Sequence, residues 1–349
     1  MMSINIHEQF KLNNLGYSKE DLIKKAIFFI ENGLDYEKHL GQFLMDWLDD
    51  RSFVSVQTSG TTGTPKLIYV EKKAMEASAL ATGIFFNLKP GDKSLLCMSA
   101  QYIAGKMMLV RALVLGLELD VIAPSATPLA ANSNYYDFVA MVPMQVASSM
   151  EDLYRVKTII IGGAKLDSKL SLQLQSLGIK AYETYGMTET VSHIAVKRIQ
   201  DDFFKVLPDV TIKTDVRNCL IIDAPKISKE AIVTNDIVEI ISDNAFKWLG
   251  RFDNVINSGG VKLFPEQIEN KLQSKIENRY FISGMKDERL GQKVILVIES
   301  NSEFKVHDSV FEKLERFEIP KAIFFTEKFE ETATNKINRK ATLLKIGVV

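Results

Sequence analysis

Segments with helical periodicity alternate with short apolar runs between residues 71 and 183. Apolar side chains at helical spacing predict helices, and the apolar runs between them predict buried strands. Strands that alternate with helices are typical of βα units on a parallel sheet, so this pattern predicts the α/β class. The predicted helices are 71–86, 104–115, 145–150 and 167–177, and the predicted strands are 94–98, 119–122, 138–142, 158–161 and 180–183.

The regions on either side of this alternation have other patterns. Ser18, with Asp21 three residues later, is typical of a helix start, and a second helix is predicted over 37–49. From residue 192 to 249 the sequence indicates only short strands and turns. We therefore expect a small β subdomain after the βα region.

The order of predicted elements changes near Asp253, where it becomes strand, helix, strand, strand, helix. Pro265 is placed to open a helix at its first turn. A unit of this length is large enough to fold around its own core. The sequence therefore predicts two domains, residues 1–252 and residues 253–349.

The composition limits the classes of partner. Lys and Arg total 43 against 44 Asp and Glu, so no net charge attracts nucleic acid or anionic lipid, and small-molecule partners are expected. The apolar stretch 107–123 is interrupted by Arg111 and Glu118, which argues against a membrane span. Only Cys97 and Cys219 occur, and the first residues lack the pattern of a signal peptide. These features predict a cytoplasmic location.

Residues 58–66 read Thr-Ser-Gly-Thr-Thr-Gly-Thr-Pro-Lys and follow a predicted strand over 53–57. Glycines free the backbone to turn and expose its N–H groups, while hydroxyls and a lysine add donors and positive charge. This composition suits a phosphate-binding loop, although an ordinary surface loop has a similar one. The residues expected to contact phosphate are Thr58, Ser59, Gly60, Thr61, Thr62, Gly63 and Lys66.

Three later stretches stand out, and the first of them also has the residue types of a ligand site. Gly162, Gly163 and Ala164 follow an apolar strand, and the ends of such strands bind ligands in open α/β sheets. The second stretch, 183–190, reads Glu-Thr-Tyr-Gly-Met-Thr-Glu-Thr, and the third, 250–260, reads Gly-Arg-Phe-Asp-Asn-Val-Ile-Asn-Ser-Gly-Gly.

Taken in order, these stretches resemble the signatures of the acyl-adenylate-forming superfamily, which includes acyl-CoA synthetases, luciferases and the adenylation domains of peptide synthetases. The resemblance extends from about residue 50 to 345. It implies a large N-terminal domain of parallel βα sheets with a small β subdomain, followed by a small mobile α+β lid domain. The first signature begins at Thr58. Relatives usually have a longer segment before it, so we expect a reduced or missing N-terminal subdomain.

The resemblance also implies roles for individual residues. Tyr185 would stack on adenine, with the backbone of 162–164 on its other face. Thr188 would hydrogen-bond the α-phosphate, and Glu189 would hold Mg²⁺, for which a carboxylate oxygen is a suitable ligand. The remaining nucleotide-binding positions in the second stretch are Glu183, Thr184 and Gly186.

Later positions carry further implied roles. The family's Thr-Gly-Asp appears here as Thr234-Asn235-Asp236, in which Asp236 would bind the ribose hydroxyls and Asn235 would tolerate left-handed backbone. Arg251 would contact ribose and phosphates, and Asp253 would be the hinge of the lid. Gly259 and Gly260 would line the pantetheine tunnel, although a plain hairpin turn has the same sequence. Lys336 would bridge the acyl carboxylate and the phosphate, although Glu330 and Asn335 replace the family's Pro and Gly nearby.

The implied reaction joins a small carboxylic acid to coenzyme A, with ATP and Mg²⁺, through an acyl-AMP intermediate. Within the superfamily, residues 102–106 and 185–195 most resemble the o-succinylbenzoate:CoA ligases of menaquinone biosynthesis. Such an acid has a second carboxylate, which needs a cation or several donors when buried. The candidate substrate-binding residues are Tyr102, Lys106, Arg111 and His193.

Several alternatives stay open. Lys106 and Arg111 lie five residues apart on one predicted helix, so we expect only one of them to point inward. Arg111 could instead reach the surface or pair with an acidic neighbour. The protein could also adenylate another small aromatic or short acyl acid, or be a nucleotide-binding relative without activity.

Overall fold

The computed structural model describes residues 6–57, 67–164, 166–332 and 337–348. Its largest element is a 13-stranded sheet in the order β12-β13-β14-β15-β11-β10-β9-β8-β7-β5-β6-β1-β2. Neighbouring strands from β6 to β9 pair in parallel, as the alternation of helices and strands predicts. This confirms the α/β class.

The helices form close to where the sequence places them. Ser18 caps α1, because its hydroxyl accepts a hydrogen bond from the Asp21 backbone N–H. The eight α-helices of the described residues are α1 (Lys19–Asn32), α2 (Asp35–Leu48), α3 (Lys72–Phe86), α4 (Ile103–Leu115), α5 (Pro143–Ser148), α6 (Ser168–Ser176), α7 (Pro265–Leu272) and α8 (Arg339–Lys345). The short 3-10 helices are η1 (Pro128–Ala131), η2 (Met150–Arg155), η3 (Thr188–Thr190), η4 (Phe252–Asn254) and η5 (Asp308–Phe311).

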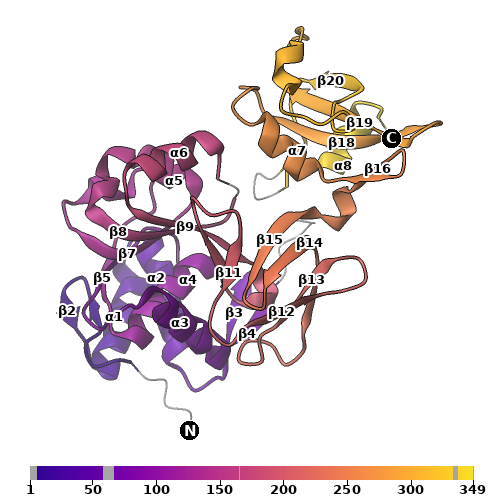
Figure 1. The fold of residues 1–349 in the computed structure, drawn as a ribbon. Helices are drawn as coiled ribbons and strands as arrows, with labels where there is room; N and C mark the ends of the chain where they lie inside the picture. Colours follow the sequence, from indigo (N-terminus) through magenta and orange to yellow (C-terminus); the bar gives the residue numbers. More distant parts are fainter. Residues whose placement is uncertain (1–5, 58–66, 165, 333–336, 349) are drawn as a thin grey trace.

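The strands of the large sheet in the βα region are β1 (Lys11–Leu12), β2 (Leu15–Gly16), β5 (Lys93–Leu96), β6 (Glu118–Val121), β7 (Tyr136–Met141), β8 (Val156–Ile161) and β9 (Lys180–Gly186). Alternate residues of β7 face opposite sides of the sheet, as strand geometry requires. Phe138 packs in the core beside α1–α4, and Val139 packs in the core on the other face, with α5 and α6. Figure 1 shows these two helix groups on either side of the strands.

The sheet continues through antiparallel strands over the region where the sequence indicates only strands. These are β10 (His193–Arg198), β11 (Phe204–Val206), β12 (Thr211–Thr214), β13 (Cys219–Asp223), β14 (Ile232–Ser242) and β15 (Ala245–Arg251). They enclose a core of their own that includes Ile194 and Phe246, so they form a β subdomain hydrogen-bonded to the parallel strands. The sequence separates strands at 231–234 and 238–241, whereas the structure joins them in β14 with a register shift after Ile237.

A second sheet lies beyond the end of β15 (Figure 1). Its strands are β16 (Ile256–Ser258), β17 (Val261–Leu263), β18 (Tyr280–Asp287), β19 (Gly291–Glu299) and β20 (Ala322–Thr326). Pro265 stands at the start of α7, as predicted. Cores on both faces of this sheet, one around Leu296 and one around Val297, make it a separate α+β unit.

A small hairpin precedes α3. Its strands are β3 (Phe53–Gln57) and β4 (Leu67–Glu71), which pair antiparallel. The sequence predicts β3 and misses β4. The phosphate-loop residues 58–66 lie between these strands but outside the described residues, as does Lys336. No helix in the described part of the chain is long and apolar enough to cross a membrane.

Candidate active site

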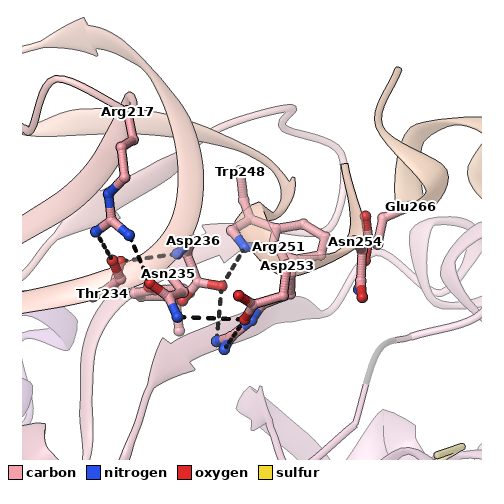
Figure 2. A network of polar contacts seen from close by, with 10 residues as sticks. Arg217, Thr234, Asn235, Asp236, Trp248, Arg251, Asp253, Asn254 and Glu266 are labelled. Carbon is pink, nitrogen blue, oxygen red and sulfur yellow. Dashed lines mark hydrogen bonds and ion pairs between the residues drawn. The ribbon is translucent and has the colours of Figure 1, made fainter. Parts of the chain in front are cut away.

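The carboxylate of Asp236 is the centre of a polar network on β14 and β15 (Figure 2). Its side chain is buried, and Oδ2 accepts a 2.7 Å hydrogen bond from the Tyr185 hydroxyl. Its Oδ1 accepts a 3.2 Å bond from Trp248 Nε1 and lies 3.5 Å from Arg251 Nη1. Donors from three sides therefore fix the orientation of this carboxylate before any ligand arrives.

Strand register explains why these residues meet. Asp236 on β14 lies opposite Arg251 on β15, and Val238 lies opposite Trp248. The backbone N–H of Asp236 also donates to the Thr234 hydroxyl at 3.0 Å. The sequence identifies Asp236 and Arg251, but it misses Trp248 because it assigns no strand to 245–251.

Asn235 does not need the left-handed backbone that asparagine would tolerate, and it is not among the residues with positive φ. It lies within β14 and uses its side chain instead. Its Oδ1 accepts from Arg217 Nη1 at 3.2 Å, and its Nδ2 donates to Asp253 Oδ2 at 3.3 Å (Figure 2). Asparagine at this position therefore links Arg217 to the predicted hinge residue.

Tyr185 packs beside the β subdomain core, with its ring in an edge contact to Phe246 at 5.2 Å between centroids. Burial and the charge of Asp236 raise the pKa of the Tyr185 hydroxyl, so it stays protonated and donates. Gly162 lies against the same strand, because a Cβ there would lie 2.5 Å from Thr184 Oγ1. The structure thus brings the 162–164 backbone beside the strand that carries Tyr185.

Two further predicted nucleotide-binding side chains also have partners within the protein. Glu183 on β9 forms a 3.0 Å ion pair with Lys197 on β10. The Thr184 hydroxyl donates to the Ile161 carbonyl at 3.2 Å. These contacts tie β9 to both of its neighbours and hold the strand end in place.

The residues after β9 turn sharply. Thr188 and Glu189 lie in η3, and Val191 follows with φ 65° and ψ −51°. The Ser192 N–H donates to the Thr190 carbonyl at 2.6 Å, which closes a γ-turn centred on Val191. Positive φ is strained for a β-branched residue and is concentrated at functional sites. The sequence gives no local signal for this turn.

Arg111 is buried on α4, with 2% of its surface exposed. Its Nη2 donates to Ser192 Oγ at 2.8 Å, and its Nε lies 3.4 Å from Thr82 Oγ1. Burial lowers the pKa of the guanidinium to about 10, so it remains charged at neutral pH. Within the described residues it forms no ion pair. Arg111 therefore neither reaches the surface nor pairs with an acidic residue in the described part of the chain, so both alternatives are wrong there.

His193 lies beside Arg111, with Nδ1 3.3 Å from Arg111 Nη2. A guanidinium has donors only, so Nδ1 must accept and the imidazole proton must be on Nε2. Burial, with the charge of Arg111, lowers the pKa of His193 well below its usual value and keeps it neutral. Its Nε2 is buried without a partner among the described residues. It is a free donor beside a buried cation.

Lys106 is buried as well, so the expectation that only one of the two cations points inward is wrong. It lies on another side of α4, with Nζ 5.0 Å from the ring centroid of Phe43 on α2. Burial lowers the pKa of its ammonium, and the charge of Asp46 opposes that shift. Tyr102, at the start of α4, is exposed. The structure therefore groups Arg111 with His193, and it leaves Lys106 and Tyr102 apart from them.

Gly259 and Gly260 form the turn between β16 and β17, with φ 58° and 83°. Positive φ at both central residues is typical of tight hairpins, so this pair does form a hairpin turn. For the metal, the described residues contain no group of three or more His, Cys, Asp or Glu side chains able to hold an ion. Glu189 is exposed, and it is not part of any such group among the described residues.

Comparison with known proteins identifies the class. The sequence model of the family described as AMP-binding enzyme matches residues 46–226, which is more than half of the chain. A solved structure of an acyl-CoA synthetase (AMP-forming)/AMP-acid ligase II-like protein from Dyadobacter fermentans is 37% identical, with a TM-score of 0.65, over 95% of this chain and 99% of that one. The fold is that of an adenylate-forming enzyme.

The chain belongs to the family of AMP-binding enzymes, among its acyl-adenylate-forming ligases. The 2-succinylbenzoate--CoA ligase of Lactococcus lactis is 26% identical over 84% of this chain and 71% of its own length. The O-succinylbenzoate coenzyme A synthetase of Bacillus subtilis, solved with ATP and magnesium ion, has a TM-score of 0.72 at 19% identity, covering 82% of this chain and 69% of its own. That structural likeness supports the fold.

Proposed function

We propose that this protein is an ATP-dependent acid:CoA ligase whose acid is o-succinylbenzoate, as a step of menaquinone biosynthesis. In the first step the acid carboxylate attacks the α-phosphate of ATP, giving acyl-AMP and pyrophosphate. In the second step the thiol of coenzyme A attacks the acyl carbon, forms the thioester and releases AMP. The similarity to named 2-succinylbenzoate--CoA ligases supports this choice of acid.

The observation that carries the proposal is the buried charge of Arg111. An unpaired buried cation costs several kcal/mol, so a carboxylate that binds beside it removes a large penalty. Arg111 and the free Nε2–H of His193 are both donors, and the Ser192 hydroxyl can rotate to donate. A group that only accepts hydrogen bonds and carries negative charge suits such a cluster. The second carboxylate of a dicarboxylic acid is such a group.

The nucleotide would bind at the Asp236 network. An ionised carboxylate has about four acceptor sites, so three donors leave room for a ribose hydroxyl, and the long contact from Arg251 is easily displaced. The Tyr185 ring and the 162–164 backbone would hold adenine. Thr188 and the 58–66 loop would hold the phosphates.

Glu189 would be a protein ligand of Mg²⁺, which commonly takes one or two carboxylates together with substrate phosphates. The ion would offset phosphate charge during adenylation. Lys336 would stabilise the charge that develops between acid and phosphate. Residues 253–349 would move as a unit about Asp253, bringing first Lys336 and then Gly259 and Gly260 to the acyl group.

The test is a panel of aromatic and short acyl acids, with pyrophosphate release measured for each. We expect o-succinylbenzoate to give the highest kcat/KM. Arg111→Met should lower kcat/KM for this diacid by about a hundredfold, because it leaves the second carboxylate buried and unpaired. It should change kcat/KM only slightly for an analogue without that carboxylate.

Lys106→Met is the matched control, because it removes a buried cation from the same helix on another side. It should leave the ratio of diacid to monoacid activity unchanged. If the ratio responds to Lys106→Met and not to Arg111→Met, the anion site is assigned to the wrong cation. If a simple monoacid is the preferred substrate of the unaltered protein, the choice of acid is wrong.

A further inference from the structure

The first turn of α7 is fastened to the end of β15. Gln267 Nε2 donates to the Trp248 carbonyl at 3.2 Å and to the Leu249 carbonyl at 2.9 Å. Gln267 belongs to the unit built on the second sheet, while both carbonyls belong to the large sheet. One side-chain amide therefore bridges the two units on opposite sides of Asp253.

Close backbone approach accompanies these bonds. A Cβ on Gly250 would lie 2.4 Å from Glu266 Oε2, so the Gly250 backbone lies directly against the Glu266 carboxylate. Glu266 is buried, and its Oε1 accepts a 2.6 Å bond from Asn254 (Figure 2). Its Oε2 has no partner among the described residues. A buried carboxylate oxygen without a hydrogen bond makes the docked position of α7 less favourable. The two hydrogen bonds of Gln267 oppose this loss of free energy.

Trp248 connects this contact to the nucleotide site. Its backbone carbonyl accepts from Gln267, and its indole N–H donates to Asp236 Oδ1 at 3.2 Å. Figure 2 shows the indole and the Asp236 carboxylate facing each other. A movement of α7 away from β15 would remove a hydrogen bond from the backbone of the residue whose indole orients Asp236.

We propose that Gln267 is a positioning residue: it holds the second unit in this orientation and, through Trp248, keeps Asp236 oriented for the nucleotide. Any rotation about Asp253 breaks both of its bonds, because donor and acceptors lie on opposite sides of that residue. Asn254 and Glu266 do not have this property, since both follow the hinge. The nucleotide part of this inference rests on the proposed function, whereas the orientation part does not.

The orientation is tested by spin-label distances in the full chain. Labels on Lys169→Cys and Lys313→Cys report on the two units, because both sites are exposed while Cys97 and Cys219 are buried. Gln267→Met keeps the side-chain length and removes the donors. It should lower the population of the wild-type distance relative to all others by about fivefold or more, the scale of two net hydrogen bonds. An unchanged distance distribution overturns the proposal.

The matched control is Gln273→Met, at the end of the same helix, whose side chain makes no hydrogen bond with the described residues. It should leave the distances unchanged. An equal response to both variants would mean that α7 is generally sensitive, and would also overturn the assignment.

The coupling is tested with the two half-reactions measured separately: pyrophosphate release without CoA, and thioester formation from supplied acyl-AMP. Gln267→Met should change the ratio of the two rates by about fivefold and weaken AMP binding about threefold. Equal losses in both rates with a lower melting temperature would mean a purely structural role. If no acid is adenylated, the proposed function fails, and the distances still decide whether Gln267 holds the orientation.

Discussion

Arg111 and Asp236 are buried charges of opposite sign in opposite surroundings. Asp236 receives hydrogen bonds from Tyr185 and Trp248 and lies near the guanidinium of Arg251. Arg111 meets only neutral groups among the described residues, and burial lowers its pKa to about 10. The protein itself satisfies the charge of Asp236, whereas Arg111 has no counter-ion in the part of the chain that the structure describes.

The difference separates two ways of building a binding site. A satisfied carboxylate is pre-oriented, so a ligand gains affinity because little has to be ordered on binding. An unpaired buried charge makes the free protein less stable. A ligand that neutralises the charge removes this penalty, and its binding affinity rises accordingly. The first arrangement suits an invariable part of the reaction, such as the nucleotide. The second suits recognition of one particular acid.

The largest expected effect is on the KM for ATP, which should depend on Asp236 and not on Arg111. Asp236→Ala removes the acceptor shared by the donors around it, and it should raise the KM for ATP by about a hundredfold, since hydrogen bonds to charged groups contribute about 1.5–3 kcal/mol each. Arg111→Met should leave that KM within about twofold. Steady-state kinetics with ATP as the varied substrate measures both. A comparable rise in the two variants would abolish the division of roles.

Stability should move in opposite directions. Arg111→Met replaces an unpaired buried cation with an apolar side chain, so it should raise the free energy of unfolding by about 1–3 kcal/mol. Asp236→Ala should lower it by a similar amount, because it leaves donors without an acceptor. Urea unfolding without ligands makes this comparison. A less stable Arg111→Met protein would mean that Arg111 has a stabilising partner.

The free energy of unfolding should depend on pH through His193. Its pKa in the folded protein lies well below the usual value of 6.5, so the unfolded chain takes up the proton first as pH falls. Stability from this residue is therefore present above pH 6.5 and declines below it, by about 1 kcal/mol between pH 6.5 and 5.5. His193→Gln should unfold with a weaker pH dependence over that interval. An identical slope would show that folding does not lower the pKa of His193.

The smallest effect should come from the edge of the Asp236 network. Asn235→Ala removes the link between Arg217 and Asp253, which are both partly open to water. Exposed contacts contribute little, so the KM for ATP should rise at most about threefold. The exposed Asn301→Ala is the control and should have no effect. A tenfold rise would place Asn235 in direct contact with the nucleotide.

Much of the fold and part of the site follow from local sequence patterns. Periodicity predicts α1–α6 and the parallel strands within a few residues, because apolar spacing directly determines which side of an element is buried. It also points to Arg111, since a charge within so apolar a helix indicates a buried ion. The resemblance to family signatures, rather than a local pattern, makes Asp236, Arg251 and His193 candidates. Local patterns miss β4, β11 and β15, which are short or lack clear alternation.

The partners of these residues are decided only by the tertiary structure. Trp248 reaches Asp236 because β14 and β15 pair in one register, and Ser192 reaches Arg111 because a strained turn at Val191 directs it there. Gln267 meets Trp248 across the junction of two units. Such contacts join residues far apart in the chain, and each depends on how whole strands and helices pack. The sequence pattern indicates which charged residues are buried. Whether such a charge meets a partner of opposite charge depends on how the strands and helices pack.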